Sequence, residues 1–245
     1  MEPFTDRREA GRQLARALCE LAGLDEPPGP ATASRHAAGR VAVVGLPGGG
    51  LLVAAGVAAA LGVTLDLLLV HRIGAPLRPE LTVGALGEGD LRGVDQELVA
   101  ALGITPLQLA EAIGPARMYL QWQGRRLREE YPPIELDGMA VVVVDDGFAT
   151  GWTAAVGCRV ARSRGAARVI AAAPVAARRA VDRLAEEADQ VVVLHAPVSF
   201  AGVGPWYLDV SRDSEQEMIA LLSGFASGEP SDDYPTATRE SPDCR

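Results

Sequence analysis

Short apolar runs alternate along the chain with segments whose apolar residues recur every three or four positions. The runs are rich in Val, Ile and Leu, which is typical of buried strands, and the spaced segments have the period of amphipathic helices. The predicted strands cover residues 41–46, 65–70, 79–86, 139–145, 169–175 and 190–195. The predicted helices cover residues 4–18, 51–61, 96–130, 153–164, 178–188 and 215–222. This alternation predicts an α/β fold with a doubly wound, mostly parallel sheet.

A single domain is expected to span residues 1–222. Residues 23–39 are rich in Pro, Gly and Ala and are predicted to form a loop. Residues from about 96 to 135 are predicted to be a helical insertion, a hood beside the sheet, in which Leu107 and Met118 pack inward and Arg125, Arg126 and Arg128 form a solvated face. The Ser-, Pro- and acid-rich residues 223–245 predict a disordered tail.

Composition narrows the class of protein. The chain has 245 residues and a formal charge of −9, and no basic cluster is interleaved with aromatic residues, so no nucleic-acid partner is expected. No apolar run is long enough to span a membrane, and the charged N-terminal residues do not form a signal peptide. Cys19, Cys158 and Cys244 form no CxxC pair, which indicates neither a zinc site nor a disulfide framework and favours a cytoplasmic location.

The chain contains no lysine, so all of its basic side chains apart from histidine are arginines. A P-loop nucleoside triphosphatase needs a lysine, and so does an enzyme that acts through a Schiff base. The sequence therefore excludes both classes. Any cation that binds phosphate in this chain must be an arginine, a protonated histidine or a metal ion.

Residues 141–153 read Val-Val-Val-Val-Asp-Asp-Gly-Phe-Ala-Thr-Gly-Trp-Thr. A buried strand, a polar turn and a helix start are indicated, and the first N–H groups of a helix have no intrahelical partner, so this turn can hold an anion. Asp145 and Asp146 would repel a phosphate in direct contact, so they are expected to face hydroxyl groups or a metal of the same ligand. The alternative is an ordinary strand-turn-helix corner with two surface carboxylates.

This segment resembles the phosphoribosyl-pyrophosphate signature of the type I phosphoribosyltransferases. It is most similar to a bacterial subgroup of uncharacterised phosphoribosyltransferase-domain proteins, in which the loop reads Asp-Asp-Gly-x-Ala-Thr-Gly-x-Thr. The opening Phe-x-Asp-Arg-x-x-Ala-Gly at residues 4–11 resembles the same subgroup. The resemblance implies that Asp145 and Asp146 hold ribose hydroxyls, directly or through Mg²⁺, and that the turn holds the 5-phosphate. The implied phosphate-binding residues are Gly147, Ala149, Thr150, Gly151, Trp152 and Thr153.

The pyrophosphate side of the implied site departs from the family pattern. The family loop after the first strand usually reads Leu-Pro-Arg-Gly-Gly, whereas here Pro47, Gly48 and Gly49 follow Leu46, so Gly48 replaces the arginine. A mere tight turn is the alternative for this loop. His71 and Arg72 occupy the place of a basic pair that the family carries at the end of the second strand, where Arg72 would meet pyrophosphate; decoration of the strand end is the alternative.

The acceptor side is less specific. Glu80 lies in a segment that resembles the family's Pro-Glu-Leu-x-x-Gly-Ala and is a candidate for acceptor or metal contact, or an exposed carboxylate. Trp206 and Tyr207 resemble a family segment just past the last strand, and they either stack on the acceptor or fill the edge of the core. Trp152 stands where the family loop has a small residue, so it would narrow the site or cap the sugar. Asp146 and Glu80 are the candidates for a general base.

The resemblance implies an enzyme that transfers ribose 5-phosphate from phosphoribosyl pyrophosphate to an acceptor and releases pyrophosphate. Its catalytic residues would be Asp145, Asp146 and Arg72, and Mg²⁺ would be bound mainly by the substrate. The alternative is a sensor that binds phosphoribosyl pyrophosphate or a nucleotide without turnover, which the missing arginine at position 48 favours. The acceptor is a small molecule that the sequence does not identify, and association between copies of the chain is left open.

Overall fold

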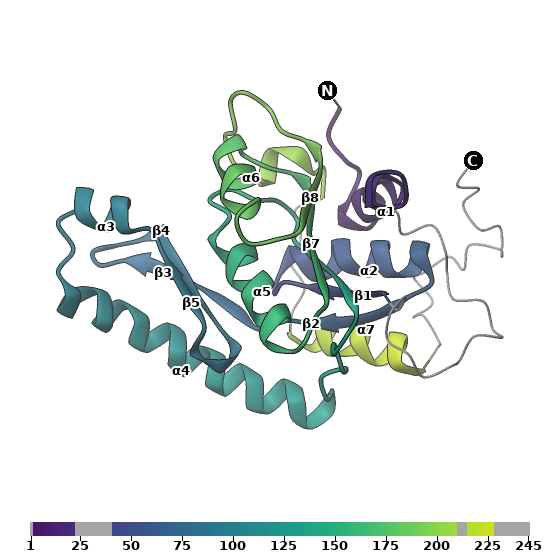
Figure 1. Ribbon diagram of the computed structural model, residues 1–245, viewed down its shortest axis with the longest axis horizontal. Helices are drawn as coiled ribbons and strands as arrows, with labels where there is room; N and C mark the ends of the chain where they lie inside the picture. Colours follow the sequence, from purple (N-terminus) through teal and green to yellow (C-terminus); the bar gives the residue numbers. More distant parts are fainter. Residues whose placement is uncertain (1, 23–40, 210–214, 228–245) are drawn as a thin grey trace.

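A computed structural model of the protein describes residues 2–22, 41–209 and 215–227. Figure 1 labels its helices and strands. They are α1 (Arg7–Ala22), β1 (Val41–Gly45), α2 (Gly49–Leu61), β2 (Thr64–Leu67), β3 (Val70–Ala75), β4 (Arg78–Gly87), η1 (Glu88–Asp90), β5 (Arg92–Val94), α3 (Gln96–Ala101), α4 (Pro106–Glu130), β6 (Ala140–Val144), α5 (Trp152–Ser163), β7 (Arg168–Val175), α6 (Arg178–Leu184), β8 (Gln190–His195), η2 (Gly204–Trp206) and α7 (Glu215–Ser227). The predicted loop at residues 23–39 lies outside the described residues.

The larger sheet is parallel throughout and has the strand order β2-β1-β6-β7-β8. Successive residues of its central strand β6 face opposite sides. Val142 and Val144 pack in a core with α1 and α2, whereas Val141 and Val143 pack in a second core with α5 and α6. Helices therefore cover both faces of the sheet (Figure 1). The predicted doubly wound α/β fold is confirmed, and its carboxyl edge is the expected place for a ligand.

A second sheet was not predicted. Strands β3, β4 and β5 form an antiparallel sheet in that order. It lies between α5 on one side and the long helix α4 on the other, and it extends away from the parallel sheet together with α3 (Figure 1). Residues 96–135 contain the helices α3 and α4 and no strand, so the predicted helical segment lies beside a small sheet that precedes it in the sequence.

The prediction of one strand over residues 65–70 is wrong. Strand β2 ends at Leu67, the backbone of Leu68 donates to Gly45 in the first sheet, and Val70 already pairs with Gly87 in the second. The run is buried from end to end, with Leu68 fully covered and Val70 4% exposed. The four residues from Leu67 to Val70 are all apolar and fit either sheet equally well, so their pattern does not show where the chain crosses from one sheet to the other.

Helix α4 begins where the sequence predicts. Thr105 and Gln108 form a capping box, and Pro106 occupies the first turn, where its missing N–H costs nothing. Ile113 and Leu120 face the core, as expected. The prediction that Leu107 and Met118 also pack inward is wrong, because their side chains are 70% and 72% exposed.

The prediction of a solvated arginine face is wrong for Arg128. Its guanidinium reaches the fully buried carboxylate of Asp66 in β2, at 2.9 Å, and the backbone carbonyl of Leu67 at 2.6 Å. Arg164 at the end of α5 donates to the other oxygen of Asp66 at 3.2 Å. Tyr131 lies near the charge of Asp66. Burial of the Tyr131 hydroxyl, and then this charge, raise the pKa of Tyr131 to about 12. This buried network fixes α4 to the parallel sheet.

Two predicted boundaries shift. Helix α6 ends at Leu184 and not at residue 188. Beyond Leu184 the chain turns, and the N–H groups of residues 186 and 187 donate to carbonyl groups three positions earlier. Helix α7 continues to Ser227, beyond the predicted domain end at residue 222. Among the described residues, no helix is long and apolar enough to cross a membrane.

Candidate active site

Three loops meet at the carboxyl edge of the parallel sheet. Strands β1 and β6 are neighbours in register, with Gly45 opposite Val144, so the loop after β1 lies beside the loop after β6. The third loop follows β7, where Phe148 donates to the carbonyl of Val175 and Ala177 donates to the carbonyl of Phe148. We call residues 47–50 the glycine loop, Asp145 and Asp146 the acidic pair, and residues 149–153 the phosphate turn. The sheet therefore brings the predicted glycine loop and acidic pair together.

The glycine loop packs directly against the acidic pair. A Cβ atom on Gly50 would lie 2.7 Å from Oδ1 of Asp145, and one on Gly49 would lie 2.0 Å from Oδ2 of Asp146. Gly48 has φ +92°, a conformation that side chains rarely adopt. An arginine at position 48 would therefore be strained here, so the departure from the family pattern accompanies a particular loop conformation.

Substituting Gly49 with alanine should destabilise the fold by about 1–3 kcal/mol, because the added methyl group overpacks the acidic pair. Asp146 would have to move, since its carboxylate occupies the space of the new Cβ. The free energy of unfolding in urea measures the effect. Gly124→Ala is the control, because its Cβ would meet only the end of the Leu69 side chain, at 3.3 Å. Equal stabilities of the two variants would contradict the close packing of the loop.

Arg7 of α1 is a site residue that the sequence did not single out. Its guanidinium contacts Oδ2 of Asp146 through Nε at 2.9 Å and through Nη2 at 2.8 Å, and it lies 5.0 Å from the centre of the Tyr207 ring. The side chain is buried, with Arg7 only 7% exposed. Its Nε would be 2.2 Å from a Cβ on Gly49, so a buried positive charge lies against the glycine loop after all. The opening motif contains Arg7 but gives no sign of this partner.

The acidic pair keeps oxygen atoms for a ligand. Oδ1 of Asp145 accepts the N–H of Asp146 at 2.9 Å, and Oδ2 of Asp146 is taken by Arg7. Within the described part of the chain, no N–H group donates to Oδ2 of Asp145 or to Oδ1 of Asp146, and the two carboxyl groups also lie within hydrogen-bonding reach of each other. Burial, and then the charge of Asp146, raise the pKa of Asp145 well above its ordinary value, while Arg7 opposes this shift.

The phosphate turn has the geometry of an anion cradle. Gly151, with φ +81°, precedes the first residue of α5. Among the described residues, no group accepts the backbone N–H groups of residues 150–153, so these donors are open to a ligand. Arg183 of α6 donates to the carbonyl of Thr150 and thereby fixes the backbone of the turn. A phosphate here would receive several N–H bonds and the favourable end of the helix dipole.

Trp152, which is predicted to narrow the site or to cap the sugar, packs against the second sheet. Its indole N–H donates to Asp95 at 3.3 Å, the Arg183 guanidinium lies 4.2 Å from the ring centre, and a Cβ on Gly93 would be 2.7 Å from the ring. The indole is therefore held against β5 by these three neighbours. A bulky side chain fits at position 152, where the family pattern has a small residue, because Gly93 of the second sheet leaves room for the indole.

Tyr207 contacts the backbone of the acidic pair, whereas its neighbour Trp206 packs on His195. The hydroxyl of Tyr207 donates to the backbone carbonyl of Asp146 at 2.6 Å, and the side chain is 4% exposed. Burial raises the pKa of the Tyr207 hydroxyl, so it stays protonated as a donor. Trp206 stacks on His195, with ring centres 5.6 Å apart, and Phe4 packs on the same histidine. These contacts favour the core-edge alternative over stacking on an acceptor.

His71 and Arg72 lie inside β3 of the second sheet and not at the end of a parallel strand, so that part of the prediction is wrong. The His71 ring packs on Tyr119 of α4 at 4.4 Å, and burial, with the charge of Arg72, lowers its pKa. Arg72 donates to the carbonyl of Pro79, next to the exposed Glu80. No contact in the described chain links these three residues to the acidic pair, and their binding roles stay predictions.

A cleft of about 560 Å³ opens beside the phosphate turn. Its walls come from the loops after β7 and β8, which the sequence analysis did not include in the site. The lining residues are Ala149, Ala177, Arg178, Arg179, Pro197, Val198, Phe200, Ala201 and Gly202. The partly buried ring of Phe200 and the exposed guanidinium groups of Arg178 and Arg179 give this cleft an apolar wall and a positive rim.

The fold and the site together define a class of protein. A doubly wound sheet carries, at its carboxyl edge, an acidic pair with open oxygens next to a turn with open N–H groups. This combination suits a ligand that has both hydroxyl groups and a phosphate.

Comparison with known proteins identifies the family. Residues 31–207 match the family model described as phosphoribosyl transferase domain, and the chain belongs to this family. Proteins of two Mycobacterium tuberculosis strains, provisionally named phosphoribosyl transferases, are 37% identical over 222 residues. The match covers 91% of this chain and 47% of each relative, so the chain spans about half the length of these curated relatives.

A solved structure shares the fold at the same level of identity. The crystal structure of the TT1426 protein of Thermus thermophilus has a TM-score of 0.70 to this chain at 37% identity, and the match covers 92% of this chain and 99% of that one. The resemblance stated from the sequence is confirmed at the level of the family and of the fold.

Proposed function

We propose that the protein transfers ribose 5-phosphate from phosphoribosyl pyrophosphate to a small-molecule acceptor and releases pyrophosphate. The observation that carries this proposal is the pairing of the acidic pair, with its open oxygens, and the phosphate turn, with its open N–H groups, at one sheet edge. The turn would bind the 5-phosphate, and the two carboxylates would bind the ribose hydroxyls. Both groups of the ligand are thereby fixed relative to the sheet, which is how binding accelerates such a transfer.

The chemistry asks for positioning and electrostatics rather than a covalent intermediate. Positive charge develops at the anomeric carbon as its bond to pyrophosphate breaks, and the carboxylates of Asp145 and Asp146 would stabilise that charge. The bond from the acceptor nucleophile to the same carbon then forms on the opposite face, and the acceptor's proton would pass to Asp146, one of the two candidate general bases, or to water. Arg7 holds Asp146 in place and keeps a positive charge at the glycine loop.

Mg²⁺ fits the donor set that the site offers. The ion prefers oxygen ligands and usually keeps only one or two carboxylates from the protein. Among the described residues, no three potential ligands gather around one point, so Asp145 and Asp146 would share the ion with oxygens of the substrate. When bound, it would neutralise the departing pyrophosphate.

The cleft beside Ala149 is the proposed place for the acceptor. It adjoins the phosphate turn, and Phe200 offers an aromatic face on which a planar ring can stack. Since Trp206 is engaged with His195, Phe200 is the better candidate for this contact.

A sensor without turnover is the second candidate. The observation that favours it is Gly48, which leaves the glycine loop without the arginine of the family pattern, while Arg7 is already paired with Asp146. Such a protein would bind phosphoribosyl pyrophosphate and release no pyrophosphate.

Pyrophosphate release from phosphoribosyl pyrophosphate and Mg²⁺, measured across a panel of purine, pyrimidine and other amine acceptors, tests the proposal. The double variant Asp145→Asn with Asp146→Asn is the control, and calorimetry measures ligand binding. Release above this control with at least one acceptor supports the enzyme. Binding without release supports the sensor, and absence of binding to the wild-type protein contradicts both.

A further inference from the structure

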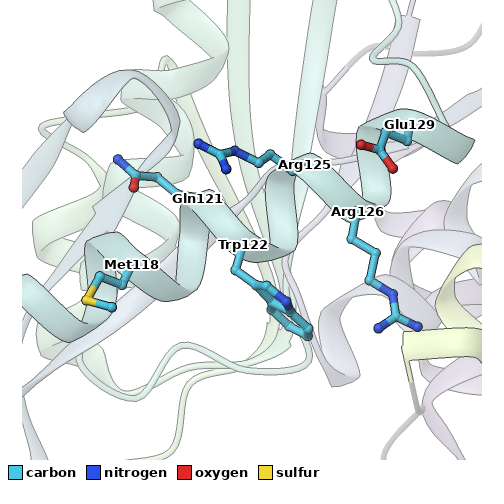
Figure 2. A pocket seen from close by; sticks show the side chains of 6 residues that line it. All are labelled: Met118, Gln121, Trp122, Arg125, Arg126 and Glu129. Atoms are coloured by element: carbon cyan, nitrogen blue, oxygen red, sulfur yellow. The ribbon is translucent and has the colours of Figure 1, made fainter.

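Helix α4 has an outward face that the fold and the proposed function leave unused. Met118 and Trp122 on this face are 72% and 52% exposed, and Leu107 near the start of the helix is 70% exposed. Figure 2 shows Met118, Gln121, Trp122, Arg125, Arg126 and Glu129, which line a shallow hollow of about 350 Å³ formed by α4 alone. Large apolar side chains that gather on one exposed helix face mark an interaction surface.

The exposed residues form a second stripe along the helix. Residues 107, 111, 114, 118, 122, 125 and 129 recur every three or four positions, and each of them lies opposite the buried side that carries Ile113, Leu120 and Leu127. An apolar and charged stripe with this spacing is the pattern by which one helix packs against another. The helix has 25 residues and is about 37 Å long, and the stripe covers all of it except the first and the last residue.

The central part of the stripe, from Glu111 to Arg125, is complementary to itself when it is reversed. Glu111 lies seven positions before Met118, and Arg125 lies seven positions after it. Gly114 and Trp122 lie four positions before and after Met118, and a Cβ on Gly114 would meet nothing within 4 Å, so the space above this glycine is open. An antiparallel copy of the helix would therefore place Trp122 over Gly114 and Arg125 opposite Glu111, each of them twice.

The charged residues of the stripe are available for such contacts. Within the part of the chain that the structure describes, neither Glu111 nor Arg125 forms an ion pair, although Arg117 and Arg128 of the same helix do. Arg126 lies over the Trp122 ring at 5.8 Å, at the side of the stripe. A two-fold axis makes each contact occur in a symmetric pair, which is the usual form of a homodimer interface.

We propose that two copies of this chain associate through their α4 helices, antiparallel, about a two-fold axis at Met118. The partner is a second copy because the stripe matches its own reversed sequence in charge, Glu111 to Arg125, and in size, Gly114 to Trp122. Helix α4 lies along one edge of the molecule, where a second copy can approach it (Figure 1).

Charge reversal tests the pairing of Glu111 with Arg125. We expect Glu111→Arg and Arg125→Glu, each alone, to raise the dimer dissociation constant of the full chain about tenfold, because each puts like charges together at two symmetric places. The double variant restores both pairs with opposite sense, so its dissociation constant should return to within about threefold of the wild-type value. Sedimentation equilibrium over a range of protein concentrations measures these constants.

Met118→Glu tests the axis, since it brings two carboxylates together there. We expect it to weaken the dimer at least about 100-fold. Leu77→Glu is the matched control, because Leu77 is a 98% exposed apolar residue in the turn between β3 and β4. A wild-type chain that stays monomeric at high concentration would overturn the proposal. A dimer that Met118→Glu leaves intact, or a double variant no better than the single ones, would do so as well.

Discussion

Replacing Arg7 with methionine should lower the rate of pyrophosphate release about 100-fold near neutral pH, the order of effect seen when a preorganised charge is removed from an active site. Methionine keeps much of the buried volume and removes the charge. Oδ2 of Asp146 would then lose both of its hydrogen bonds, and the carboxylate would no longer be held beside the glycine loop. The prediction rests on the proposed transferase activity.

The pH dependence separates this role from simple packing. Arg7 lowers the pKa of Asp145, which burial and Asp146 raise. Without Arg7 the pKa of Asp145 rises further, so a higher pH is needed to ionise it, and the acid limb of the pH–rate profile should move to higher pH. Arg7→Lys, which keeps a charge, should reverse most of this shift.

Arg12→Met is the matched control, because Arg12 is an exposed arginine of the same helix. It should leave both the rate and the profile unchanged. A uniform loss of activity in Arg7→Met at every pH, with no movement of the acid limb, would show that Arg7 has only a packing role.

Replacing Asp66 with asparagine should reduce the free energy of unfolding by about 3–5 kcal/mol, the usual cost of breaking a buried ion pair by removing one partner. Asp66 is fully buried and contacts Arg128 of α4 and Arg164 of α5. Among the described residues, the substitution leaves Arg164 without an ion-pair partner, and Arg128 keeps only its contact with the carboxylate of Glu88 at 3.1 Å. This is a large share of the stability of an ordinary domain, about 5–15 kcal/mol.

Asp90→Asn supplies the control for this experiment. Asp90 also pairs with an arginine of α4, Arg117, but its side chain is 57% exposed. Because exposed ion pairs contribute about 0–1 kcal/mol, this variant should differ little from the wild-type protein in urea unfolding. Similar losses in the two variants would mean that burial does not determine the strength of the Asp66 network.

The arrangement of the site explains how the altered glycine loop can coexist with a phosphoribosyl transferase fold. The family pattern puts an arginine within the loop, whereas here Gly48 adopts a positive φ and the charge against the loop comes from Arg7 of α1. The same arginine binds Asp146, which in turn is supported by the hydroxyl of Tyr207 at its backbone carbonyl. Two segments far from Asp146 in the sequence therefore hold this residue, one at its carboxylate and one at its backbone carbonyl.

Local patterns in the sequence determined most of the helices and strands, and they identified the glycine loop, the acidic pair and the phosphate turn. The valine run, the two carboxylates and the Thr/Gly turn of residues 141–153 predict a strand, an acidic pair and a helix start, because these depend on neighbours within a few positions. The Gly-rich loop at residues 47–50 follows the same logic. Parallel pairing of β1 with β6 was enough to bring the two segments together.

The tertiary structure alone decided the contacts between distant residues. Arg7 and Asp146 are 139 positions apart, and no spacing rule connects them. The residues from Leu67 to Val70 are all apolar, so only packing decided that the segment divides between two sheets and carries His71 and Arg72 away from the strand end. Arg128 resembles its exposed neighbours in sequence and differs only in meeting Asp66. Burial and partner choice are properties of the folded arrangement, because they depend on which surfaces meet after the elements have formed.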